Sequence, residues 1–153
     1  MHENKTKPNA DAGPVDRLVG RLESERAEDG ALLVLAADAA GLRVLSWLQD
    51  AYPFVEEASG NRYGWNPLVF DSHALRLAAA LRLTVGDDDQ SVRSMAFAYA
   101  RHRQDLPHCY EPSQRDPAAA YRRAIVRAAA ALADRKLPIW PNELSRAAVG
   151  GLL

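Results

Sequence analysis

The sequence has few of the residues that build disulfide, metal or membrane scaffolds. Its 153 residues include one cysteine, Cys109, and four histidines. A single cysteine excludes a disulfide within the chain and fits a reducing compartment. The longest apolar run, Ala31–Leu42, is too short to cross a bilayer and contains Asp38. We therefore expect a cytoplasmic protein without a membrane segment.

Residues 1–13 differ in composition from the rest of the chain. They are polar, carry Pro8 and Gly13, and lack the apolar core of a secretory signal. We expect them to form a disordered tail. Because 48% of the whole sequence is apolar, the remaining residues, 14–153, are expected to form a single globular domain.

Charge is distributed unevenly along the chain. The net charge of -1 gives no general case for a polyanionic partner. However, the span from Arg101 to Lys136 holds eight basic and four acidic residues. Such a local excess is expected either on an anion-binding surface or on a solvated helix face that acids elsewhere in the fold neutralise.

Two helices are predicted before residue 42. The first begins at Pro14 and has apolar residues at helical spacing, namely Val15, Leu18, Val19 and Leu22. Asp29-Gly30 interrupts this pattern, so a second helix is predicted over Ala31–Ala40, with Gly41 as its stop.

Short strands are predicted next. Runs of β-branched and aromatic residues indicate strands near Arg43–Leu48 and Phe54–Glu57. Arg62–Phe70 is predicted as a loop whose aromatic residues pack onto the core as a lid; these are Tyr63, Trp65 and Phe70.

The segment Trp65–Leu81 is the one around which we expect the chain to be organised. Asp71 is a good N-cap for a helix. The buried stripe of this helix is predicted to consist of Ala74, Leu75, Ala78 and Leu81. Leu83–Val85 is then predicted as a strand and Gly86–Asp89 as a turn.

The region before the last long helix is ambiguous. Residues 92–102 fit either a strand, in which Met95, Phe97 and Tyr99 alternate, or a helix. Gln104–Ser113, with two prolines, is predicted as a loop.

The clearest helix signal begins at Asp116, a candidate N-cap followed by Pro117. Its predicted buried face consists of Tyr121, Ala124, Ile125, Ala128 and Leu132. The helix is expected to end near Asp134. An extended arm over Leu137–Pro141 and a short helix over 143–149, capped by Asn142, are expected to follow.

No motif for catalysis or phosphate binding is complete. The sequence has no glycine-rich phosphate loop, no nucleophile elbow and no helical His-Glu zinc motif. Cys109 lies beside His108, but neighbouring residues in a loop point apart. A metal site built from His102, His108, Cys109 and Glu111 would match no standard ligand spacing. We predict no metal, no cofactor and no enzymatic activity, with a small enzyme of unknown reaction as an alternative.

Two candidate binding surfaces follow from the sequence. The first is expected either to line a small polar cleft or to bond and pack the loop itself; it comprises Trp65, Asn66, Asp71 and Arg76. The second lies off the apolar stripe of the last long helix and comprises Arg122, Arg123 and Arg127. With Arg76, these arginines form a candidate site for nucleic acid or an anionic nucleotide, and Tyr99 or Tyr110 are candidate stacking partners. His73 is interpreted as a surface or cap-lining residue.

Four segments occur in a set order: Ala31–Gly41, Gly64–Leu68 with its WNPL sequence, Ala74–Ala78, and Asp116–Ala130 with its RRAIVRAAA sequence. In this order they resemble small uncharacterised proteins of tailed phages and prophages of Gram-negative bacteria. The likeness covers residues 31–134 in patches, whereas Val69–His73 departs from the pattern. It implies an α+β fold, with helices packed on a small, mainly antiparallel sheet.

The resemblance also implies a function. We expect a non-enzymatic phage or prophage accessory protein, in the host cytoplasm, that binds a host component, for example as a counter-defence inhibitor. A host or phage protein is then the expected partner. The alternative is a protein that binds nucleic acid or an anionic nucleotide through its arginines.

Overall fold

A computed structural model describes residues 13–88 and 94–139. Its helices are α1 (Pro14–Ala39), α2 (Asp71–Ala80) and α3 (Pro117–Ile139). Its strands are β1 (Arg43–Leu48), β2 (Tyr52–Glu56), β3 (Arg62–Gly64), β4 (Leu83–Asp88), β5 (Met95–Ala100) and β6 (Cys109–Pro112). The strands form two antiparallel sheets, β1-β2-β3 and β4-β5-β6. The α+β class is confirmed, with two small sheets where one was expected.

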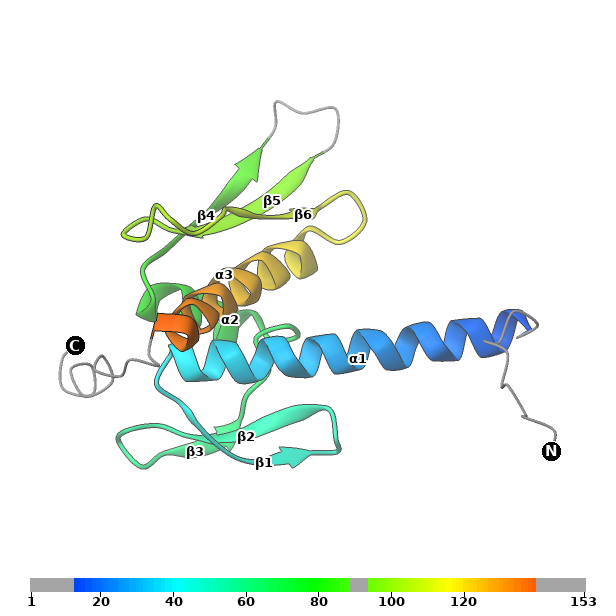
Figure 1. Ribbon diagram of the computed structural model, residues 1–153, viewed down its shortest axis with the longest axis horizontal. Helices are drawn as coiled ribbons and strands as arrows, with labels where there is room; N and C mark the ends of the chain where they lie inside the picture. The colour runs from blue at the N-terminus through cyan, green and yellow to red at the C-terminus, as the bar shows by residue number, and fades with distance from the viewer. Residues whose placement is uncertain (1–12, 89–93, 140–153) are drawn as a thin grey trace, which may run out of the picture.

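The helices lie between the two sheets, as Figure 1 shows. α3 packs against β5 and β6 on one side and against α1 on the other. α1 in turn contacts β1 and β2, and α2 crosses close to α3. Each sheet therefore turns one face to the helices and the other outward.

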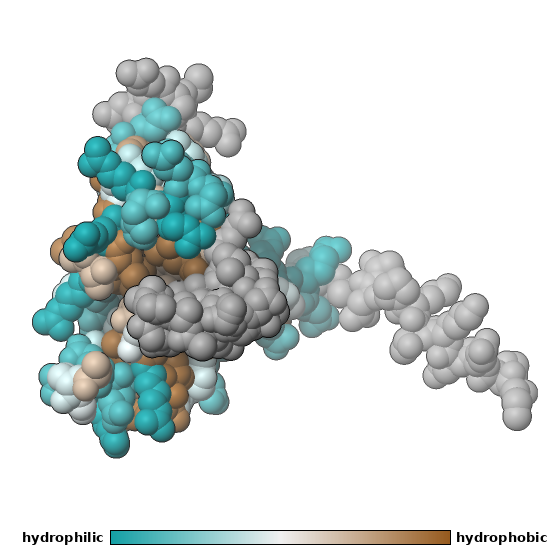
Figure 2. Space-filling model, turned by 60° about the vertical axis from the view of Figure 1, so that its left-hand side comes forward, coloured by the Kyte–Doolittle hydropathy of each residue, from teal (hydrophilic) through white to brown (hydrophobic). Residues whose placement is uncertain are grey.

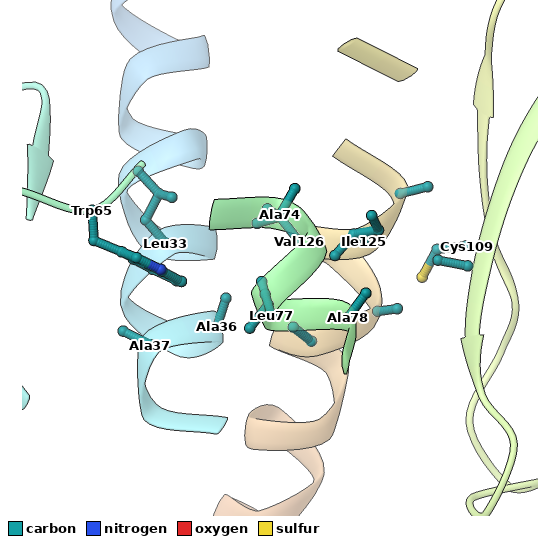
Figure 3. Close-up of a cluster of buried hydrophobic side chains, with 14 of the residues drawn as sticks. Leu33, Ala36, Ala37, Trp65, Ala74, Leu77, Ala78, Cys109, Ile125 and Val126 are labelled. Carbon is teal, nitrogen blue, oxygen red and sulfur yellow. The ribbon is translucent and has the colours of Figure 1, made fainter. Parts of the chain in front are cut away.

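Small side chains let these layers approach closely. In β5, Ala96, Ala98 and Ala100 are buried, whereas the intervening residues are only partly buried. Within the ambiguous region, residues 95–100 therefore form a strand whose buried face carries alanines. α3 is buried on several sides and contributes Ala124, Ile125, Val126, Ala128 and Ala129. Figure 3 shows the core that results, with labelled side chains from α1, α2 and α3.

α1 is one continuous helix, so the predicted break at Asp29-Gly30 is wrong. A helical glycine costs only about 1 kcal/mol relative to alanine, which tertiary packing can offset. The Trp47 side chain lies over Gly30, 3.7 Å from where a Cβ would stand. The predicted stop is confirmed, because Gly41 has a φ of +74° and the Leu42 amide donates to the Ala37 carbonyl at 2.9 Å.

α2 begins at the predicted residue but not in the predicted way. The N-cap is Phe70, and Asp71 makes no capping bond because its carboxylate binds Arg122 from α3 at 2.7 Å. The buried residues of α2 are Ala74, Leu77 and Ala78. The predicted Leu75 is instead 66% exposed, and Leu81 is only partly buried.

Three predicted loops or turns contain strands, and the described part of one predicted arm, residues 137–139, is helical. Arg62–Gly64 is β3, Gly86–Asp88 belongs to β4, and Cys109–Pro112 is β6. α3 continues to Ile139, beyond the predicted end at Asp134. Its predicted cap is confirmed, because the Ala119 amide donates to Asp116 Oδ1 at 3.0 Å.

The predicted aromatic lid is only partly confirmed, since Trp65 is buried but Phe70 is 49% exposed. The predicted tail before residue 13 and the elements predicted beyond residue 139 lie outside the described residues. No helix in the described ranges is both long and apolar enough to cross a membrane.

Leu33 is a test of the core. Leu33→Ala should lower the free energy of unfolding by about 2–5 kcal/mol, because the side chain is 1% exposed and its loss leaves a cavity. Val34→Ala is the matched control, since Val34 is 42% exposed. Urea denaturation measures both, and equal losses would contradict the packing described.

Candidate binding surfaces

The N-terminal half of α1 projects away from the three layers (Figure 1). Every described side chain from Pro14 to Glu28 is exposed. Three of them are large and apolar, with exposures of 70% for Val15, 51% for Leu18 and 47% for Val19. We call these three residues the α1 stripe.

The α1 stripe is the uncovered part of a longer apolar face. Residues 18 positions apart in an α-helix point in the same direction, because 18 residues make five turns of 3.6. Val15 is thus aligned with Leu33, and the other two stripe residues are aligned with Ala36 and Ala37. These three partners are 1%, 0% and 0% exposed. The same helix face is therefore core at one end and surface at the other.

A pocket of about 260 Å³ opens where α1 ends, between α2 and the β2–β3 hairpin. Its apolar walls are Ala40, Leu42, Ala58, Trp65, Leu77 and Ala80. Its polar side chains are Glu57, Tyr63, His73 and Arg76. An apolar cavity with a few converging polar groups is typical of a ligand site.

The hairpin holds Glu57 in place at the pocket. The Tyr63 hydroxyl donates to Glu57 Oε1 at 2.9 Å, and the Ser59 hydroxyl donates to Oε2 at 3.1 Å. These two hydrogen bonds lower the pKa of Glu57. Burial and the bond to Glu57 raise the pKa of Tyr63 to about 12. At neutral pH the pair is therefore a carboxylate and a neutral phenol.

His73 is fixed by the loop that precedes α2. Its Nδ1 accepts a hydrogen bond from the backbone N–H of Asn66 at 2.9 Å, so the neutral ring carries its proton on Nε2. Burial, together with the positive charge of Arg76, lowers the pKa of His73. Asn66 also organises the loop, because its side-chain oxygen accepts from the Leu68 amide at 3.2 Å.

The candidate residues of the first predicted surface are thus divided. Trp65 and Arg76 line the pocket, and Asn66 positions His73 beside them. Asp71 lies instead in an apolar groove of about 310 Å³ between α2 and α3. On the face seen in Figure 2, hydrophobic surface gathers in the middle and lower parts.

Sequence reasoning missed Glu57 and Tyr63 and interpreted His73 as a surface residue. Two signals were available. His73 and Arg76 are three residues apart, which places them on one face of a helix. Ser59-Gly60-Asn61 is a turn sequence, and a hairpin there brings Glu57 back beside Tyr63.

The predicted arginine surface is largely occupied by bonds within the protein. Arg122 Nε donates to the Leu68 carbonyl at 2.8 Å and Nη1 donates to Asp71 at 2.7 Å. Its side chain is only 16% exposed. Arg122 therefore joins α3 to the start of α2.

The other two arginines meet acids from distant parts of the chain. Arg123 binds Asp29 of α1 at 2.7 Å, and Arg127 binds Glu111 of β6 at the same distance. Their side chains are 32% and 40% exposed. Because each charge is already paired, this arrangement does not favour the nucleic-acid alternative.

The cysteine and its neighbouring histidine face opposite sides of a sheet. Cys109 is buried in the core, and this burial raises its pKa. His108 is exposed and stacks on Tyr99 with ring centroids 3.9 Å apart. Within residues 13–88 and 94–139, no three His, Cys, Asp or Glu side chains converge as a metal site would require.

No family model matches the chain, and no curated protein or solved structure matches it with significance.

Arg122→Met should lower the free energy of unfolding by about 1–3 kcal/mol, because the half-buried Leu68 carbonyl loses its donor. Arg127→Met should cost less, about 0–1 kcal/mol, since that arginine is more exposed. Chemical denaturation compares them, and the reverse order would show that Arg122 does not anchor the loop.

The lowered pKa of His73 predicts a pH dependence of stability. The unfolded chain takes up the His73 proton near pH 6.5, and the folded protein takes it up only at lower pH. Between these two values the unfolded state binds more protons, so stability falls as the pH falls. His73→Asn, which keeps a hydrogen-bond acceptor, should lose less stability than wild type between about pH 7.5 and 5. Urea unfolding across this range measures the difference, and parallel pH profiles would contradict the prediction.

Proposed function

We propose that this chain is a protein-binding module and that the α1 stripe docks an amphipathic helix of another protein. The observation that supports this is the change in exposure along one helix face, from 70% at Val15 to 1% at Leu33. An isolated helical segment without tertiary packing is marginal in water. A partner that covers the stripe would give this segment the packing that α3 gives the other half.

The charges around the stripe support a protein partner over a membrane. Residues 14–28 carry four acids, Asp16, Glu23, Glu25 and Glu28, and three bases, Arg17, Arg21 and Arg26. A helix that lies on a membrane surface usually has a polar face rich in Lys and Arg. Flanking charges of both signs are instead typical of helix–helix pairs, in which they select the partner.

The identity of the partner is a separate proposal. The resemblance to phage and prophage proteins supports a host protein, bound by an accessory protein that acts without catalysis, for example as a counter-defence inhibitor. Gene neighbourhood tests this context: a position among counter-defence genes supports it, and one among bacterial metabolic genes contradicts it.

The stripe is tested with two aspartates on one helix. Leu18→Asp places a charge in the stripe, and Ser24→Asp places the same charge on another face, about 120° from Leu18 and about 180° from Val15 at 100° per residue. A photoreactive residue at position 18 should crosslink a partner that one at position 24 does not. With that partner purified, Leu18→Asp should weaken binding about tenfold or more, and Ser24→Asp should leave the dissociation constant unchanged.

Three results would overturn the proposal. Equal crosslinking from both positions would show that the stripe has no special role. Unchanged affinity of Leu18→Asp would exclude it from the interface. A crosslink to a second copy of this chain would identify the stripe as a dimer contact rather than as a site for another protein.

A further inference from the structure

The pocket at the end of α1 presents one charge of each sign. The Glu57 carboxylate is ionised and held by Tyr63 and Ser59. Arg76 is exposed and makes no hydrogen bond or ion pair with any residue in the described ranges. It lines the same pocket as Glu57, Tyr63 and His73.

His73 adds a neutral donor to this pair. Since its Nδ1 accepts from the backbone N–H of Asn66, the hydrogen-bonding group that remains on the ring is the Nε2 proton. His73 and Arg76 come from the same face of α2, whereas Glu57 comes from the hairpin. The pocket therefore has two donors on one wall and an acceptor on another.

The space between these groups is apolar. Leu42, Trp65 and Leu77 line it, and the buried Trp65 indole, 3% exposed, belongs to the core and cannot move freely. The volume of about 260 Å³ lies just below the usual range for small-molecule pockets, which begins at about 300 Å³. A ligand of the pocket is therefore small and has an apolar body.

We propose that the pocket binds a free α-amino acid with an aromatic or branched apolar side chain. Its carboxylate binds Arg76 and the His73 Nε2 proton, its ammonium group binds Glu57, and its side chain packs against Trp65. A simple anion is repelled by Glu57, and a simple cation is repelled by Arg76. A zwitterion matches both charges, and the apolar walls select its side chain. This site is independent of the α1 stripe.

The test is isothermal titration of the full chain with L-phenylalanine and L-leucine. Three probes each lack one part of the ligand: N-acetyl-L-phenylalanine has no ammonium group, L-phenylalaninamide has no carboxylate, and glycine has no side chain. We expect both free amino acids to bind. Each of the three probes should bind about tenfold or more weakly than L-phenylalanine.

Variants assign the two charges. Arg76→Met should weaken the binding of L-phenylalanine about tenfold or more. It should leave the affinity for L-phenylalaninamide unchanged, because the amide makes no ion pair with Arg76. Glu57→Gln should weaken the binding of L-phenylalanine but not the binding of N-acetyl-L-phenylalanine, which has no ammonium group. Arg101→Met, at an exposed arginine outside the pocket, is the matched control and should change neither affinity.

Circular dichroism of each variant establishes that it is folded before it is titrated. The proposal is wrong if neither free amino acid binds. It is also wrong if the probes bind as tightly as L-phenylalanine, or if Arg76→Met and Arg101→Met have equal effects. Leu18→Asp should retain wild-type affinity for L-phenylalanine, which separates this site from the protein-binding surface.

Discussion

The arrangement of this protein depends on the close packing of α3 between the β4–β6 sheet and α1. Alanines make it possible, because Ala96 and Ala98 of β5 and Ala124 and Ala128 of α3 are all buried. Side chains of this size let the backbones of a strand and a helix approach closely and pack without voids. A larger residue at these positions would separate the layers. The arginines of α3 then fasten it at its edges, to α1 through Asp29 and to β6 through Glu111.

This packing also determines where binding surfaces occur. α3 covers only the C-terminal part of α1. The apolar face of α1 is therefore buried in its C-terminal half and exposed in its N-terminal half. At the other end of α1, Gly41 turns the chain into β1, and the end of the helix leaves a pocket against α2 and the hairpin. Polar groups gather there because the β2–β3 hairpin contributes Glu57 and Tyr63, and one face of α2 contributes His73 and Arg76.

The parts of the fold that were predictable have local signals. Asp116-Pro117 starts α3 and Gly41 ends α1, because a cap and a left-handed glycine act within one turn. The break at Asp29-Gly30 was wrong because Trp47, distant in sequence, packs over it. Trp65 and Arg76 are candidates from the sequence alone. Glu57 reaches the pocket only because the pairing of β2 with β3 places it beside Tyr63, and the register of that pairing is not visible in the sequence. That acids elsewhere in the fold neutralise the arginines was one expectation from the sequence, but which acids do so depends on the packing of α3 against α1 and β6.

The order of elements has a consequence for synthesis on the ribosome. Each sheet is a meander of sequential strands, so its contacts are local and can form as soon as its strands have emerged. α3 follows both sheets in the chain and joins the β4–β6 sheet to α1, which contacts the first sheet. In a nascent chain that ends before α3, the first meander can already pack on α1, but the alanine face of the β4–β6 meander is uncovered. Such a chain depends on chaperones or on rapid elongation until that helix arrives.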